Sequence, residues 1–167
     1  DKEWDAIQAA QKLKVQWSNA APAFPEQAAI YDFIRNAKVR KGEVVTNTGN
    51  VDDAFKNAAR VIEAEYEWPY QSHASMGPGC AVVDYKDGAA TVWTGSQKPH
   101  YVREGVAAIL ELPEDKVHGI WAMGPGSYGR NDAGDAAMDA AVLSKAVGKP
   151  VRVQWMRNEG HRWDPKA

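Results

Sequence analysis

A strand, a glycine-rich loop, a long helix and a second strand follow one another near the end of this 167-residue sequence, and this succession constrains the fold most. Residues 117–122 predict a strand, and the alanine-rich residues 133–147 predict a helix. Gly148 and Pro150 supply the helix stop signal, and residues 151–155 predict the second strand. A chain of this kind must place helices against a sheet.

The rest of the chain indicates helices first and a hairpin in the middle. Apolar spacing and capping signals predict helices over residues 3–14, 25–36, 51–58 and 99–110. Strand character lies at residues 61–68, 81–85 and 90–93. The Asp87-Gly88 pair predicts a tight hairpin turn between the last two. The expected fold class is therefore α+β, or α/β, with a mixed β-sheet and helices packed on it.

One domain over residues 1–167 is the simplest organisation. The alternative is a helical connecting segment at residues 1–50, followed by a partial α/β domain at residues 51–167. The chain begins at Asp1 without a methionine, and residues 163–167 do not have the character of a natural tail. We therefore expect an internal piece of a longer protein.

Composition excludes several function classes. The net charge of −2 gives no basic surface for nucleic acid or an acidic membrane. No run approaches the ~18 apolar residues of a membrane span. The single cysteine, Cys80, excludes an internal disulfide or a cysteine-based metal cluster, and its apolar neighbours predict a buried, inert thiol. One free cysteine suits cytoplasm and periplasm alike, so the compartment stays open, with the periplasm slightly favoured.

The histidines and tryptophans do not indicate a functional site. The four histidines are scattered without ligand spacing, so no metal site is expected from this chain alone. Core packing is the expected role of most of the tryptophans at positions 4, 93, 121 and 155. Ser127 lies between glycines, but the Gly-x-Ser-x-Gly spacing of a hydrolase nucleophile is absent.

The most unusual string is the glycine-rich loop at residues 123–130, which includes Gly126, Ser127, Tyr128, Gly129 and Arg130. Glycines allow positive φ and close approach of the backbone to a ligand. The N–H groups at the start of the following helix, which we expect Asp132 to cap, favour anions. A plain tight turn is the other interpretation. The G-x-G-x-x-G match in this loop lacks the acidic residue that a dinucleotide-binding unit requires.

Gln97 stands where a predicted strand passes into a helix that starts with proline. A neutral amide at such a place can donate a hydrogen bond to an oxygen of a ligand. Taken by itself, however, the sequence around Gln97 favours a role as a turn or capping residue.

Taken in order, these strings resemble the molybdopterin-binding large subunits of the xanthine dehydrogenase and aldehyde oxidase family, of the isoquinoline 1-oxidoreductase or aldehyde dehydrogenase type. The similarity rests on the order of five strings along nearly the whole chain. They are the Leu-Lys-Val-Gln-Trp run ending at Trp17, residues 64–79 with His73-Ala74-Ser75-Met76, the string from Trp93 to Gln97, the loop from Gly126 to Arg130, and Gly148-Lys149-Pro150-Val151-Arg152 with Arg157 and Glu159.

The resemblance implies cofactor contacts from Gln97, Tyr128 and Gly129, with Gly126, Ser127 and Arg130 beside them. The cofactor would be molybdopterin, in its cytosine dinucleotide form. The intact enzyme would oxidise an aldehyde or an N-heterocycle by water-derived hydroxylation. Its partners would be the rest of the large subunit and an iron–sulfur subunit. The family's catalytic glutamate lies outside these 167 residues, so no catalytic residue is expected here.

Two functions remain open from the sequence. The chain could contribute cofactor contacts to an enzyme without tightly binding the cofactor or turning over alone. It could instead be a non-catalytic structural or interaction domain with the same fold and no cofactor.

Overall fold

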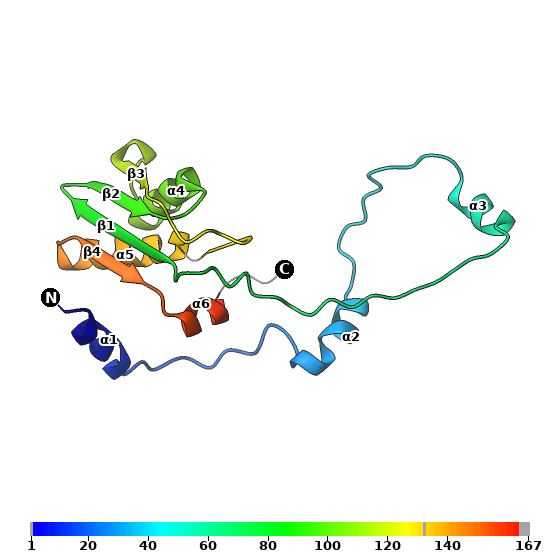
Figure 1. Ribbon diagram of the computed structural model, residues 1–167, viewed down its shortest axis with the longest axis horizontal. Coiled ribbons are helices and arrows are strands. Elements are labelled where there is room, and N and C mark those ends of the chain that lie inside the picture. The colour runs from blue at the N-terminus through cyan, green and yellow to red at the C-terminus, as the bar shows by residue number, and fades with distance from the viewer. Residues whose placement is uncertain (1, 132, 164–167) are drawn as a thin grey trace. The chain divides into compact units, whose positions relative to one another are not determined.

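The computed structural model describes residues 2–131 and 133–163 (Figure 1). Its contacts divide the chain into two units, Asp1–Glu67 and Trp68–Ala167. The sheet and the two long helices belong to the second unit. The sequence-based boundary near residue 50 stays a prediction.

A four-stranded mixed sheet forms the centre of the second unit. Its strands are β1 (Cys80–Lys86), β2 (Ala89–Thr94), β3 (Val117–Trp121) and β4 (Val151–Gln154), arranged in the order β3-β2-β1-β4. β1 pairs antiparallel with β2 and with β4, whereas β2 and β3 are parallel. The α+β class with a mixed sheet is confirmed.

The hairpin between β1 and β2 turns at the predicted Asp-Gly pair. Asp87 and Gly88 have φ values of 50° and 76°, and Lys86 pairs with Ala89 directly across the turn. Two successive residues with positive φ match the right-handed twist of the flanking strands. The turn therefore sets the register of the hairpin, which places Val83 opposite Val92 in the core.

The long helices α4 (Pro99–Leu110) and α5 (Ala133–Val147) both supply buried residues to the core that lies against the sheet. Every second strand residue, such as Val83 and Val92, enters that core. The face of α5 that enters the core is made of alanines, which allow a helix to lie close to a sheet. They are Ala136, Ala137, Ala140 and Ala141, all fully buried.

The ends of these helices follow their local signals. Pro99 occupies the first turn of α4, and Glu111, in the left-handed conformation, ends it. Asn131 accepts a hydrogen bond from the N–H of Ala133 at the start of α5. Asp132, the expected cap, lies outside the described residues. Gly148 ends α5 at a φ of 64°.

The strand expected at residues 61–68 was wrong. The described chain has no helix or strand between Ala58 and Gly79, and Ile62, Tyr66 and Trp68 are all more than 70% exposed. A strand needs a second strand beside it to satisfy its backbone, and no strand of the described chain pairs with this stretch. A short 3₁₀ helix, Glu114–Lys116, and a C-terminal helix, α6 (Arg157–Trp163), were not predicted.

The expected core role of the tryptophans was also largely wrong. Trp4, Trp93 and Trp121 are exposed, and of the four only Trp155 packs against the core. Its indole N–H donates to Asp139 at 3.0 Å. Ile109, in the last turn of α4, is 46% exposed, although its neighbour Leu110 is buried. Cys80 is half-buried, less enclosed than expected. Trp93 and Cys80 alternate with the buried residues Val92 and Ala81 along their strands, so they lie on the opposite face of the sheet from the core.

The first unit contains short helices joined by extended chain. They are α1 (Glu3–Lys12), a 3₁₀ turn at Gln27–Ala29, α2 (Ile30–Arg35) and α3 (Val51–Asn57). Asn50 caps α3 as predicted, because its side chain accepts from the N–H of Asp53. Among the described residues of this unit, Ile30 alone is buried.

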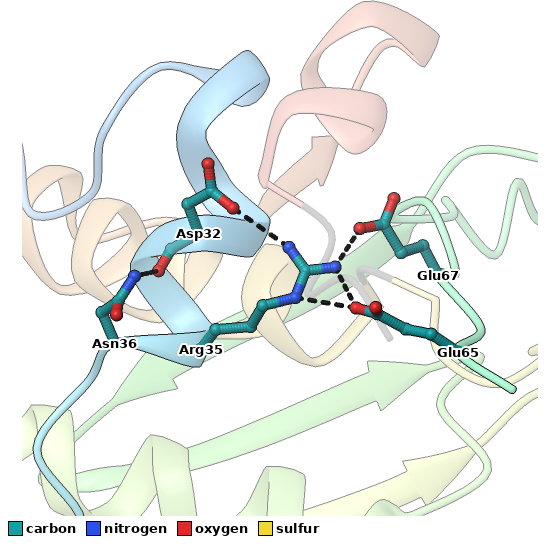
Figure 2. A network of polar contacts seen from close by, with 5 residues as sticks. All are labelled: Asp32, Arg35, Asn36, Glu65 and Glu67. Carbon is teal, nitrogen blue, oxygen red and sulfur yellow. Dashed lines mark hydrogen bonds and ion pairs between the residues drawn. The ribbon is translucent and has the colours of Figure 1, made fainter. Parts of the chain in front are cut away.

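A polar cluster joins α2 to the extended chain that leaves the first unit (Figure 2). Arg35 donates to Glu65 from Nε at 2.8 Å and to Asp32 at 3.1 Å, and its Nη2 also contacts Glu65 and Glu67. The hydrogen bonds that Arg35 donates to the carboxylates of Glu67 and Glu65 raise the pKa of Arg35 above its ordinary value. The cluster is exposed, so it fixes the local path of the chain more than it stabilises the fold.

No helix in the described part of the chain has both the length and the apolar character to cross a membrane.

Candidate functional site

The expected site residues lie at one edge of the sheet, where the parallel strands β2 and β3 end. Each strand leads through a loop into a helix, β2 into α4 and β3 into α5. The N-terminal ends of both helices therefore open on the same side. Ligands of open sheets bind outside the carboxyl ends of parallel strands, where backbone N–H groups of helix starts favour anions.

The two loops approach each other at a pair of glycines. A Cβ built on Gly124 would lie 2.7 Å from the carbonyl oxygen of Gly95. The N–H of Ala122 donates to the carbonyl of Thr94 at 2.9 Å, so the β2–β3 pairing continues up to this point. Any side chain at either glycine would separate the loops. This contact fixes where the chain from Gly95 to Gln97 stands against the glycine-rich loop.

The glycine-rich loop has an uncommon backbone. Gly126, Tyr128 and Gly129 have φ values of 86°, 52° and 124°. Our expectation that at least one of the two glycines has positive φ is confirmed. A positive φ is costly for Tyr128, and such residues persist only where their surroundings fix them. The Tyr128 side chain is 61% exposed, so the loop presents this ring to solvent.

A cleft of about 280 Å³ brings together residues from both loops and both helices. Gln97, Ser127, Gly129 and Arg130 line it, although the first lies thirty positions or more before the others. Gly126 and Tyr128, the other two expected site residues, are in the same loop but do not line the cleft.

Charged side chains stand around this cleft. Arg130 forms an ion pair with Asp135, with both carboxylate oxygens within 3.2 Å of its Nη2. The ammonium of Lys98 lies 5.7 Å from the centre of the Tyr101 ring. All four residues line the cleft, so the part of its lining that the structure describes carries two cations and one carboxylate. This balance favours an anionic or oxygen-rich ligand.

Sequence reasoning missed Asn131, which ties the loop to the helix that follows it. Its Nδ2 donates to the carbonyl of Gly126 at 3.2 Å, while its Oδ1 accepts from the N–H of Ala133 at 3.1 Å. An asparagine two residues before a predicted helix start is the signal that could have identified it.

Ser127 has a local role. Its Oγ accepts a hydrogen bond from the N–H of Gly129 at 3.3 Å, which closes a turn within the loop. Within residues 2–131 and 133–163, no group of three or more histidine, cysteine or acidic side chains is arranged to hold a metal ion.

Known proteins resemble this chain in sequence and in fold. The sequence profile of the molybdopterin cofactor-binding domain matches residues 34–166. A nicotinate dehydrogenase subunit of Pseudomonas putida is 41% identical over the whole chain, which covers 14% of that protein. The aldehyde oxidoreductase molybdenum-binding subunit PaoC of Escherichia coli is 34% identical over 66% of this chain and 15% of its own length.

The fold is also found in the crystal structure of quinoline 2-oxidoreductase from Pseudomonas putida 86. That structure matches 95% of this chain and 21% of its own, with a TM-score of 0.68 and 24% identity. The chain thus spans between about a seventh and a fifth of the proteins that it resembles.

Proposed function

The chain belongs to the molybdopterin cofactor-binding domain family, and from that premise we propose that the cleft between the starts of α4 and α5 contacts the molybdenum cofactor. One observation carries the proposal. Gln97, Ser127, Gly129 and Arg130, four of the site residues expected from the sequence, line the same cleft.

The residues present fit such a group. Molybdopterin is rich in oxygen, and its dinucleotide form adds phosphate, so it needs hydrogen-bond donors and room for close approach. Gln97 offers an amide donor, Arg130 and Lys98 offer cationic donors, and the first turn of α5 offers backbone N–H groups. Gly129 has no side chain in the way of the ligand. The phosphates suit the helix starts, which supports the cytosine dinucleotide form as our proposal.

When bound, the molybdenum centre supplies the redox chemistry of the reaction. The residues of this chain would orient it. Gln97 would donate a hydrogen bond to an oxygen of the bound group, and Arg130, paired with Asp135, would bind negative charge on it. Positioning of this kind lowers a barrier because the donors need not reorganise during the reaction.

The activity of the whole protein is a further part of the proposal. Similarity to a nicotinate dehydrogenase subunit and to an aldehyde oxidoreductase subunit supports oxidation of an N-heterocycle or an aldehyde. The remaining large-subunit sequence and an iron–sulfur subunit would complete the enzyme. We expect the 167 residues alone to be inactive and not to retain the cofactor tightly.

Replacement of Gln97 in the holoenzyme tests the proposed function. We expect Gln97→Ala to lower kcat by ~10² or more, as the loss of one positioned donor does. Because Gln97 is exposed, the free energy of unfolding should change by less than ~1 kcal/mol. Gln16→Ala, an exposed glutamine outside the cleft, is the matched control and should leave kcat unchanged.

Unchanged kcat with a lowered melting temperature would make Gln97 a turn residue. If the purified full-length protein contains neither molybdenum nor pterin, that result would support the alternative of a non-catalytic interaction domain. Metal analysis and pterin fluorescence of the same preparations decide between these outcomes.

A further inference from the structure

A short segment, residues 73–77, lies against the glycine-rich loop although about fifty residues separate them in sequence. Three of its residues meet three points of the loop. A Cβ built on Gly129 would stand 2.2 Å from Cδ2 of His73, and one built on Gly77 would stand 3.0 Å from Cβ of Pro125. The hydroxyl of Ser75 donates to the carbonyl of Arg130 at 3.4 Å. We call residues 73–77 the support segment.

The support segment is itself held in a defined conformation. Ser75 is 7% exposed, which is unusual for a serine outside a helix or strand. Ala74, next to it, has a φ of 45°, a value that a non-glycine residue keeps only under constraint. Arg157, the first residue of α6, donates to the carbonyl of Met76 at 2.9 Å. The segment is thus anchored from one side and contacts the loop on the other.

Of the two glycines in these contacts, Gly129 beside His73 leaves less room for a side chain than Gly77 does. Gly129 needs to be glycine for two separate reasons, its φ of 124° and the histidine ring beside its Cα. Packing of a ring against a Cα leaves the loop backbone little freedom to move toward it. Gly129 also lines the cleft. The ring of His73 therefore limits where one wall of the cleft can stand.

We propose that His73 and Ser75 are positioning residues that hold the loop from Gly126 to Arg130 in the conformation required for cofactor contact. They act through Gly129 and Arg130 and do not themselves line the cleft. This inference rests on the proposed function, because the cleft is the site whose shape they maintain.

A double-mutant cycle in the 167-residue chain tests the contact without any cofactor. Gly129→Ala should lower the melting temperature, and His73→Ala should reduce that loss by removing the atoms that the new methyl group would strike. Gly148→Ala is the matched control. Gly148 also has a positive φ, of 64°, but its Cβ would meet no atom within 4 Å. The cost of Gly148→Ala should be the same with histidine or alanine at position 73.

Cofactor retention in the holoenzyme tests the functional part. We expect His73→Ala and Ser75→Ala to lose molybdenum and pterin ~10-fold more readily on dialysis, a typical effect of residues behind a metal site. Val106→Ala, in the core and away from the cleft, serves as a control for lost stability. If His73 and Ser75 had a purely structural role, the cofactor loss of the three variants would rise in proportion to the decrease in their melting temperatures.

The two failures are distinguishable. Additive effects of His73→Ala and Gly129→Ala, or cofactor loss no greater than in Val106→Ala, would overturn the positioning role and leave the proposed function standing. If the purified wild-type full-length protein contains no molybdenum, that result would overturn the proposed function, and the positioning role with it.

Discussion

At the scale of the residue, the shape of the site depends on side chains that need not touch the ligand. Asn131 is the clearest case, because one amide makes two different bonds. Its oxygen satisfies the N–H of Ala133 at the start of α5, and its nitrogen holds the carbonyl of Gly126. Stability and loop geometry therefore depend on different atoms of the same residue.

Two substitutions of Asn131 should separate these roles. Asn131→Asp keeps an oxygen for the helix start, so the free energy of unfolding should stay close to that of the wild type. It loses the donor to Gly126, so the amides of residues 126–130 should exchange faster. Asn131→Ala loses both bonds and should cost about 1 kcal/mol in addition. Denaturation and hydrogen exchange measure the two effects, and equal stability of the two variants would contradict the assignment.

At the scale of the element, buried polar groups hold the layers in register. Ser144 of α5 is fully buried, and its hydroxyl accepts from the N–H of Tyr85 in β1 at 2.9 Å. The same hydroxyl donates to the carbonyl of Lys149, two residues before β4, at 2.8 Å. One side chain thus joins α5 to β1 and to the turn that leads into β4.

Ser144→Ala removes a single oxygen atom, but it should destabilise the second unit strongly. It leaves the N–H of half-buried Tyr85 and the carbonyl of exposed Lys149 without this partner. A buried donor without a partner costs ~1–3 kcal/mol, whereas an exposed carbonyl can bond to water, so we expect a total of about 1–3 kcal/mol. Ser18→Ala, at an exposed serine, is the matched control and should change stability very little. Chemical denaturation gives both values. A loss no larger than that of Ser18→Ala would mean that water replaces the hydroxyl.

At the scale of the whole molecule, the two units differ in how much they bury. The second unit has a continuous core against its sheet, whereas Ile30 is the single buried residue among those described in the first unit. The helices α1 and α3 have no buried side chain at all. Helices of ten residues or fewer are marginal in water unless tertiary packing supports them.

The isolated 167-residue chain should therefore be cleaved first within residues 2–67. Limited proteolysis with mass spectrometry should release pieces of this region, while the sheet and its two long helices, from about residue 78 to residue 155, stay intact. Hydrogen exchange should show the same contrast, with α5 most protected because its face is fully buried. Equal protection of α1 and α5 would mean that the first unit has packing partners that burial does not reveal.

The sequence by itself determined the elements whose signals are local. The helices at residues 99–110 and 133–147 were predicted with their observed bounds, because proline, glycine and apolar spacing lie within the elements themselves. The Asp87-Gly88 turn was predicted for the same reason. The positive φ in the glycine-rich loop also followed from the intrinsic freedom of glycine.

The tertiary structure alone decided what depends on distant partners. Residues 61–68 have strand character but no neighbouring strand, and Trp93 and Trp121 lie in strands at positions that no element covers. The approach of Gly95 to Gly124 and of His73 to Gly129 joins segments whose local patterns do not refer to each other. A local pattern fixes the preference of a segment for helix, turn or strand. Strand pairing, burial and cleft lining are properties of two segments at once, so they are settled only when the chain brings those segments together.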